Sequence, residues 1–135
     1  MVADYNLISM KQREFLILLL ILILATFFRF YKLAESFYFI SDAGRDAQAA
    51  FKIIIDHKLT LIGPRASVAG FFLGPFYFYL ITIPLWLLRM DPIGLAYFSS
   101  FLGVLAVFLV YLVAKRLFDT LAGLVAAFLY AVSPI

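Results

Sequence analysis

The chain has 135 residues, of which 66% are hydrophobic and 14% are charged, against about 45–50% apolar and about 25% charged in soluble domains. Too few polar residues are available to cover a water-facing surface, so the composition predicts that lipid solvates much of the protein. The net charge of +3 is spread along the chain, so membrane lipids are expected partners and nucleic acid is not. The absence of cysteine excludes disulfides and thiolate chemistry.

The first apolar stretch follows a short N-terminal segment that carries Lys11 and Arg13. It continues into an aromatic tail, and together they predict a transmembrane helix over about residues 15–33. Near the end of this helix, Arg29 and Lys32 are expected to snorkel towards the membrane interface. A cleaved signal peptide is the alternative, but no small-residue cleavage site follows, and the aromatic tail suits an interfacial anchor better.

Three further apolar stretches follow. Residues 71–88 are interrupted by helix-breaking sites at Pro75 and Pro84. Residues 93–114 contain neither charge nor proline and give the clearest predicted transmembrane helix. Residues 121–135 are expected to begin a third transmembrane helix, and because no polar tail closes this run, we expect the sequence to be the N-terminal part of a longer protein.

Basic residues predict the orientation of these helices. Lys11 and Arg13 precede the first helix, and the pair 115–116 follows the second, and the positive-inside rule places both pairs in the cytoplasm. This arrangement requires that residues 71–88 do not cross the membrane; if they crossed, the two pairs would lie on opposite sides. Residues 34–92 then form one long extracytoplasmic loop with helices of its own.

This loop contains a predicted amphipathic helix over about residues 41–57. Ser41 is a good N-cap, and Asp42 follows in the first turn, where negative charge is favoured. Apolar residues recur at spacings of three to four, which predicts a helix able to lie flat on the membrane. These residues are Ala43, Ala47, Ala50, Phe51, Ile54 and Ile55.

The same helix carries the candidate site. Asp42 and Asp46 are four residues apart and share a face, and Arg45 lies beside them. Just after a transmembrane helix, a carboxylate at this place can deprotonate an acceptor hydroxyl or hold a divalent cation. The alternative is a solvated helix face with weak ion pairs. Further along, Arg65 is a candidate phosphate contact in what otherwise reads as a plain loop.

Aromatic residues dominate the interrupted stretch that ends the loop. They are most simply an interfacial belt, and stacking on a sugar or a prenyl chain is the alternative. The stripe consists of Phe76, Tyr77, Phe78, Tyr79 and Trp86.

The order of these features resembles the N-terminal part of GT-C glycosyltransferases. The resemblance rests on FRFYKL, SDAGRDAQAAFKII, DHKLTLIGPRAS, GPFYFYLITIPLWLL, DPIGLA and AKRLFDTLAGLVAAFLYAVSP, taken in sequence. The nearest groups are the family 39-like and Rgt-type enzymes, which are akin to protein O-mannosyltransferases and lipid A aminoarabinose transferases. The catalytic subunits of oligosaccharyltransferases are similar at greater distance.

The resemblance implies a polytopic all-α membrane protein with amphipathic juxtamembrane helices, about residues 41–57 and 76–88, in the first extracytoplasmic loop. It implies that Asp42 is the catalytic acidic residue of this loop. Many members carry an acidic or amide residue directly after it, whereas Ala43 stands here, so a paired-carboxylate arrangement requires Asp46. The second acidic site and the groups that bind the carrier phosphate are expected beyond residue 135, so this chain alone is not expected to be active.

By this resemblance the protein is an inverting glycosyltransferase of the cytoplasmic membrane. Its expected donor is a polyprenyl-phosphate sugar, and its expected acceptor is a lipid, a glycan or a protein. Arg45 and Arg65 are the local candidates to meet the charge of the leaving phosphate, and Asp46 is a further candidate substrate contact. Two other classes stay open: a small non-catalytic scaffold or assembly protein, and a fragment of a multi-pass transporter. A transporter is expected to place ionisable residues at mid-membrane, whereas here the charges concentrate in the loop.

Overall fold

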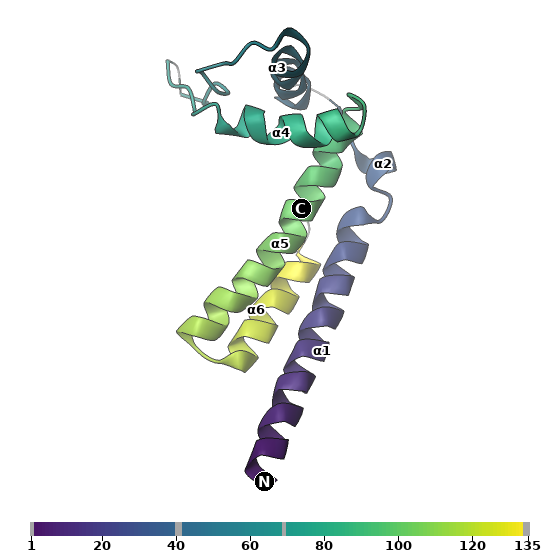
Figure 1. Ribbon diagram of the computed structural model, residues 1–135, viewed down its shortest axis with the longest axis vertical. Helices are drawn as coiled ribbons and strands as arrows, with labels where there is room; N and C mark the ends of the chain where they lie inside the picture. Colours follow the sequence, from purple (N-terminus) through teal and green to yellow (C-terminus); the bar gives the residue numbers. More distant parts are fainter. Residues whose placement is uncertain (1, 40–41, 69, 134–135) are drawn as a thin grey trace. The chain divides into compact units, whose positions relative to one another are not determined.

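The computed structural model describes residues 2–39, 42–68 and 70–133, with the backbone alone for residues 2–10. In this described part the regular structure consists of helices joined by turns and loops, without a strand (Figure 1), and the predicted all-α class is confirmed. The N-cap predicted at Ser41 lies outside it. The helices are α1 (Val2–Phe30), α2 (Leu33–Ser36), α3 (Asp42–Asp56), α4 (Phe76–Leu87), α5 (Ile93–Leu117) and α6 (Thr120–Val132).

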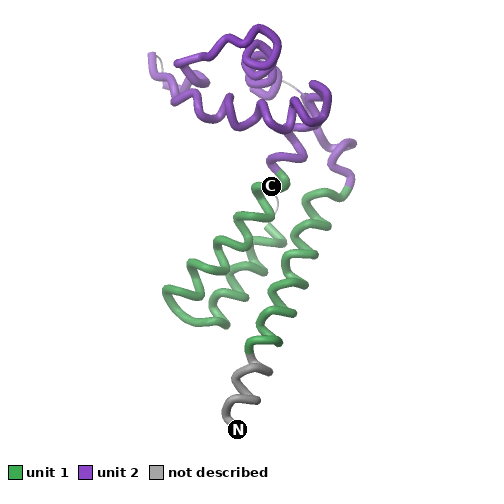
Figure 2. The backbone as a smooth tube through the Cα atoms, viewed as in Figure 1, with its two compact units in different colours: residues 1–31, 100–135 green, residues 32–99 purple. Residues whose placement is uncertain are grey.

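The helices form two compact units (Figure 2). Unit 1 contains Met1–Tyr31 and Ser100–Ile135, and unit 2 contains Lys32–Ser99, so the boundary falls within α5. Each unit has its own small hydrophobic core. The candidate catalytic residues therefore belong to a unit that is distinct from the one built by α1 and α6.

Helix α5 is the one helix in the described residues that is long and apolar enough to cross a membrane. Its start is capped by Asp91, whose Oδ1 accepts a hydrogen bond from the backbone N–H of Ile93 at 2.9 Å. It runs three residues beyond the predicted end at 114, because Lys115 and Arg116 suit the negative end of the helix dipole. Helices α4 and α6 are apolar but shorter.

Unit 1 packs α1 and α6 closely because small residues meet at their contact. Ala25 of α1 and Ala127 and Ala131 of α6 are almost fully buried, and they let the helix backbones approach. Asp119 caps α6 by accepting the N–H of Ala122 at 2.7 Å. The rest of this core is Leu18, Ile21, Val107 and Tyr111. Large apolar side chains also cover the outside of the unit: Phe15, Leu20, Leu109, Val113 and Leu121 are all at least half exposed.

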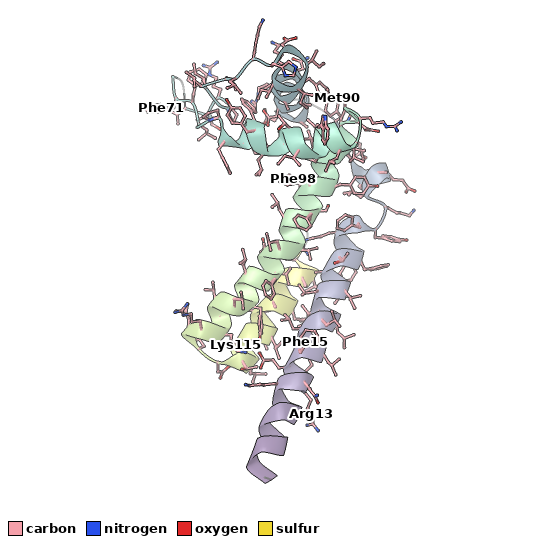
Figure 3. All side chains as sticks on the ribbon, viewed as in Figure 1. Arg13, Phe15, Phe71, Met90, Phe98 and Lys115 are labelled. Carbon is pink, nitrogen blue, oxygen red and sulfur yellow. The ribbon has the colours of Figure 1, made fainter. Side chains whose placement is uncertain are left out.

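The basic residues before the apolar part of α1 and those at the end of α5 lie at the same end of unit 1. Glu14 of α1 forms an ion pair with Lys115 of α5 and accepts a hydrogen bond from the hydroxyl of Tyr111. In Figure 3, Arg13 and Lys115 lie towards the same end of the unit. The N-terminal basic residues and those that close α5 are therefore at the same end, as the positive-inside argument requires.

The end of α1 departs from the sequence expectation. The helix stops at Phe30 rather than near residue 33, because Lys32 adopts a left-handed φ of 53°. Lys32 is exposed, and it pairs with Glu35 at 3.2 Å. Arg29 was expected to snorkel, but it is 7% exposed. It finds hydrogen-bond acceptors within unit 1, so it does not need to reach water.

Unit 2 is built around the contact between α3 and α4. Ala47 and Ala50 of α3 are fully buried against Ile81 and Leu85 of α4, and Phe78 and Leu95 complete the core. The sequence predicts that α3 is able to lie flat on the membrane. In the structure α4 packs against part of the apolar face of α3, and the membrane contact stays a prediction. Ile55, at the end of α3, stays 65% exposed. An apolar helix face can be covered either by another helix or by lipid. The spacing of apolar residues is the same in both cases, so it does not tell which of the two covers the face.

Helix α4 begins after Pro75 and continues past Pro84, which is buried inside it. Pro84 therefore does not end the helix, contrary to the interruption that the sequence suggests. The turn into α5 passes through Arg89 and Met90, which both have left-handed φ values, and the Met90 N–H bonds the carbonyl of Leu85 at 2.7 Å. This turn closes α4 and starts α5 within a few residues.

Candidate functional site

The candidate site is a cluster of three charged residues at the start of α3. Arg45 lies between two carboxylates: its Nη1 donates to Oδ1 of Asp42 at 2.9 Å, and its Nε donates to Oδ1 of Asp46 at 2.9 Å. Nη2 of Arg45 adds a second contact to the same Asp46 oxygen at 2.8 Å. The helical spacing brings all three groups together, as the sequence predicts for residues that share a face.

The two carboxylates differ sharply in exposure. The side chain of Asp46 is 9% exposed, whereas that of Asp42 is 83% exposed. A buried carboxylate needs charged hydrogen-bond donors to replace lost water, and Arg45 supplies two of them. Asp42 keeps most of its surface open to an incoming group. Asp46 therefore suits a holding role, and Asp42 suits contact with a substrate.

The formal charges of the cluster sum to −1, since one guanidinium meets two carboxylates. The hydrogen bond to Asp46 is the largest cause that raises the pKa of Arg45, and the charges of both carboxylates act in the same direction. Arg45 stays protonated, with its charge directed at its two neighbours. This arrangement leaves less of the guanidinium for a phosphate than the sequence prediction assumed.

Tyr77 of α4, which the sequence places only in the aromatic stripe, is electrostatically coupled to the cluster. Burial is the main cause that raises its pKa; the charge of Asp46 raises it further, and that of Arg45 lowers it in part. The hydroxyl of Tyr77 is therefore protonated at neutral pH and lies within electrostatic range of the cluster. No local sequence pattern links residue 77 to residues 42–46, because the α3–α4 packing alone brings them together.

Arg65 forms no hydrogen bond or ion pair with the cluster in the described residues. It is exposed, it sits in the loop before α4, and it pairs with Phe72 through an isolated antiparallel bridge. The loop is closed by backbone hydrogen bonds, with the N–H of Gly63 on the carbonyl of Leu73 at 3.0 Å. A Cβ atom on Gly63 would lie 2.2 Å from the Gly74 carbonyl oxygen, so only glycine fits there. Figure 3 shows Phe71 at the outer part of this loop.

The described residues give no group of three histidine, cysteine, aspartate or glutamate side chains placed to hold a metal ion. Between Asp42 and Asp46, the positive charge of Arg45 already contacts both carboxylates. The divalent cation considered from the sequence therefore stays a prediction.

Replacing Asp46 with alanine tests the holding role. We expect a loss of about 1 kcal/mol in the free energy of unfolding, because Arg45 loses two charged contacts but is exposed enough for solvent to screen part of them. Chemical denaturation in detergent measures the change. Glu35→Ala is the matched control, since its ion pair with Lys32 is exposed on both sides. Equal effects of the two variants would contradict a special role for Asp46.

The fold and the cluster define a class: an all-helical protein with a candidate membrane-spanning helix and a carboxylate-rich site in a separate helical unit. The sequence model of the family described as dolichyl-phosphate-mannose-protein mannosyltransferase matches residues 73–135. The resemblance to GT-C glycosyltransferases is thereby confirmed for the part of the chain that contains α4, α5 and α6. No curated protein and no solved structure matches the chain.

Proposed function

We propose that the full-length protein is a membrane glycosyltransferase that moves a sugar from a polyprenyl-phosphate donor to a hydroxyl of a lipid, glycan or protein acceptor. The observation that carries this proposal is the match of residues 73–135 to the mannosyltransferase family. The candidate residues at 42–46 lie outside the matched part. Their helix, α3, is joined to it through the buried contact with α4.

The proposed topology places the N-terminus in the cytoplasm and unit 2 at the outer face of the cytoplasmic membrane. Three observations support it. Helix α4 has 12 residues, or about 18 Å, and is too short for a hydrocarbon core of about 30 Å. The two basic ends of unit 1 lie together through Glu14 and Lys115. The outer surface of unit 1 is apolar, which suits lipid.

In the proposed reaction, the acceptor hydroxyl attacks the anomeric carbon of the donor sugar. The new C–O bond forms as the bond between that carbon and the phosphate oxygen breaks, so the configuration inverts and polyprenyl phosphate leaves with the electron pair. Asp42 accepts the hydroxyl proton as general base. Its exposure and its single hydrogen bond from Arg45 support this role, because one side of the carboxylate is fixed and the other is open.

Arg45 and Arg65 have different proposed roles. Arg45 fixes the orientation of Asp42 through the hydrogen bond from its Nη1. Arg65 is exposed and has no ion pair in the described residues, so it is the better local candidate for the leaving phosphate. The remaining positive charge that a phosphate leaving group needs would come from parts of the full-length protein beyond these residues, or from a divalent cation.

A transfer assay tests the function. Membranes that contain the full-length protein are mixed with radiolabelled polyprenyl-phosphate sugars, mannose first, and the acceptor fraction is analysed for label. We expect incorporation of sugar with matching release of polyprenyl phosphate. Transfer from a nucleotide sugar in membranes depleted of polyprenyl phosphate would contradict a lipid-linked donor. Absence of transfer from every lipid-linked sugar tested would contradict the proposal as a whole.

A further inference from the structure

Arg29 is the buried cation of unit 1. It lies in the last turn of α1 and is 7% exposed. Its guanidinium reaches the end of α6, where Nη1 donates to the carbonyl of Ala131 at 3.3 Å and Nη2 to the carbonyl of Tyr130 at 3.2 Å. The guanidinium carbon also lies 5.7 Å from the centre of the Tyr130 ring. These contacts join residues about a hundred positions apart in the chain.

Within the residues that the structure describes, the charge of Arg29 is balanced without a carboxylate. In the described residues it forms no ion pair. Helices α1 and α6 both end beside it, at Phe30 and Val132, and each C-terminus carries about half a negative charge. The two ends together offset roughly one positive charge, and the face of Tyr130 adds a further attraction. The two helix ends therefore account for a buried cation that otherwise would be costly.

Helix α5 provides the space that this side chain occupies. A Cβ atom on Gly103 would lie 2.5 Å from Nε and 2.9 Å from Cδ of Arg29, so any larger residue displaces the guanidinium. The Ser100 hydroxyl donates to the backbone carbonyl of Arg29 at 3.2 Å, which satisfies an acceptor at the end of α1. Nε itself is buried and lacks a hydrogen-bond partner in the described residues, so the guanidinium is held by its two outer nitrogens.

We propose that Arg29 is a positioning residue that holds the C-terminal end of α6 against that of α1 and so fixes where the chain leaves α6 at Ser133. The physical need is clear if lipid surrounds unit 1. Helix α6 has 13 residues, or about 20 Å, which is less than the apolar thickness of a bilayer. Its last carbonyls then end within an environment that offers no hydrogen-bond donor. Arg29 supplies two. This inference does not depend on the proposed enzymatic activity.

Paired spin labels test the proposal, and the absence of native cysteine makes labelling selective. One pair uses Phe28→Cys and Val132→Cys, both at exposed positions near the joined helix ends. The second pair uses Leu16→Cys and Leu121→Cys, exposed positions in the middle of α1 and at the start of α6. Double electron–electron resonance on the full chain in lipid nanodiscs gives the distance distribution of each pair. With Arg29 present, we expect both distributions to be narrow.

Arg29→Gln is expected to broaden the distribution of the 28–132 pair and to leave the 16–121 pair unchanged. Gly103→Ala is expected to do the same, although it keeps the guanidinium, because the new methyl group displaces it. Gly44→Ala is the matched control, since a Cβ there meets nothing closer than 3.9 Å. If Arg29→Gln unfolds unit 1, the distance distributions of both label pairs broaden. The Gly103→Ala variant then tests the proposal. The proposal is overturned if Gly103→Ala leaves the 28–132 pair unchanged or broadens both pairs equally.

Discussion

Replacing Asp42 with asparagine in the full-length protein is expected to lower the rate of sugar transfer by about 10²–10⁴-fold, the usual contribution of general acid–base catalysis. Asparagine keeps the size of the side chain and can still accept a hydrogen bond from Arg45, but it cannot take a proton from the acceptor hydroxyl. Initial rates with saturating donor measure the effect. Binding of the donor is expected to change little, because the carbonyl oxygen of asparagine keeps the contact geometry.

The matched control for this experiment is Asp56→Asn. Asp56 ends the same helix and is exposed, but it lies about four turns from Asp42 and outside the cluster. The Asp56→Asn variant is expected to transfer sugar at the normal rate. Both variants are expected to unfold at the same denaturant concentration as the unaltered protein, since exposed surface substitutions rarely exceed about 0.5 kcal/mol. Normal transfer by Asp42→Asn would show that Asp42 is not the general base, and Asp46 would then be the next candidate.

Exposure distinguishes these two carboxylates more clearly than their sequence spacing does. By spacing alone the two carboxylates appear equivalent, and in the sequence only the resemblance to GT-C glycosyltransferases singles out Asp42. In the structure, α4 covers Asp46 and leaves Asp42 open. The direction in which the helix faces its neighbour therefore supports the different roles proposed for Asp42 and Asp46. The sequence shows the helical spacing of the apolar residues in α3, but it does not show which helix packs against them.

The sequence is most informative where a local pattern determines the structure. The charge-free run from residue 93 predicts α5, and aspartates at positions 91 and 119 precede α5 and α6 as N-caps. The all-helical class follows from the same apolar runs. These features depend on contacts within a few residues, so composition and spacing are enough to predict them.

The sequence is least informative where contacts join distant segments. Arg29 reads as an interfacial residue at the end of an apolar helix, yet it is buried by Ala131 and Gly103, which lie more than 70 positions away. Tyr77 joins the charge cluster for the same reason. Pro84 reads as a helix breaker, but α4 runs through it, because tertiary packing overrides local preference. In each case the structure depends on contacts with residues far away in the sequence, so a short stretch of sequence does not reveal it.

The contact between α3 and α4 gives the second large expected effect. Leu85→Ala removes a fully buried side chain from a small core that Ala47, Ala50 and Ile81 share. Loss of a buried leucine typically costs about 2–5 kcal/mol, and few other contacts in unit 2 can compensate. We expect α3 to separate from α4 and sugar transfer to fall sharply, although Asp42 itself is unchanged. Hydrogen exchange of the α3 amides is expected to increase along with the loss of transfer.

Leu87→Ala is the matched control, because Leu87 lies two residues further along α4 and is 65% exposed. Its truncation is expected to change the free energy of unfolding by no more than about 0.5 kcal/mol and to leave the α3 amides protected. The comparison separates packing from the general apolar character of α4. If Leu85→Ala retained both normal exchange and normal transfer, α3 would be held in place by something other than this core. The position of Asp42 would then have to depend on contacts outside unit 2.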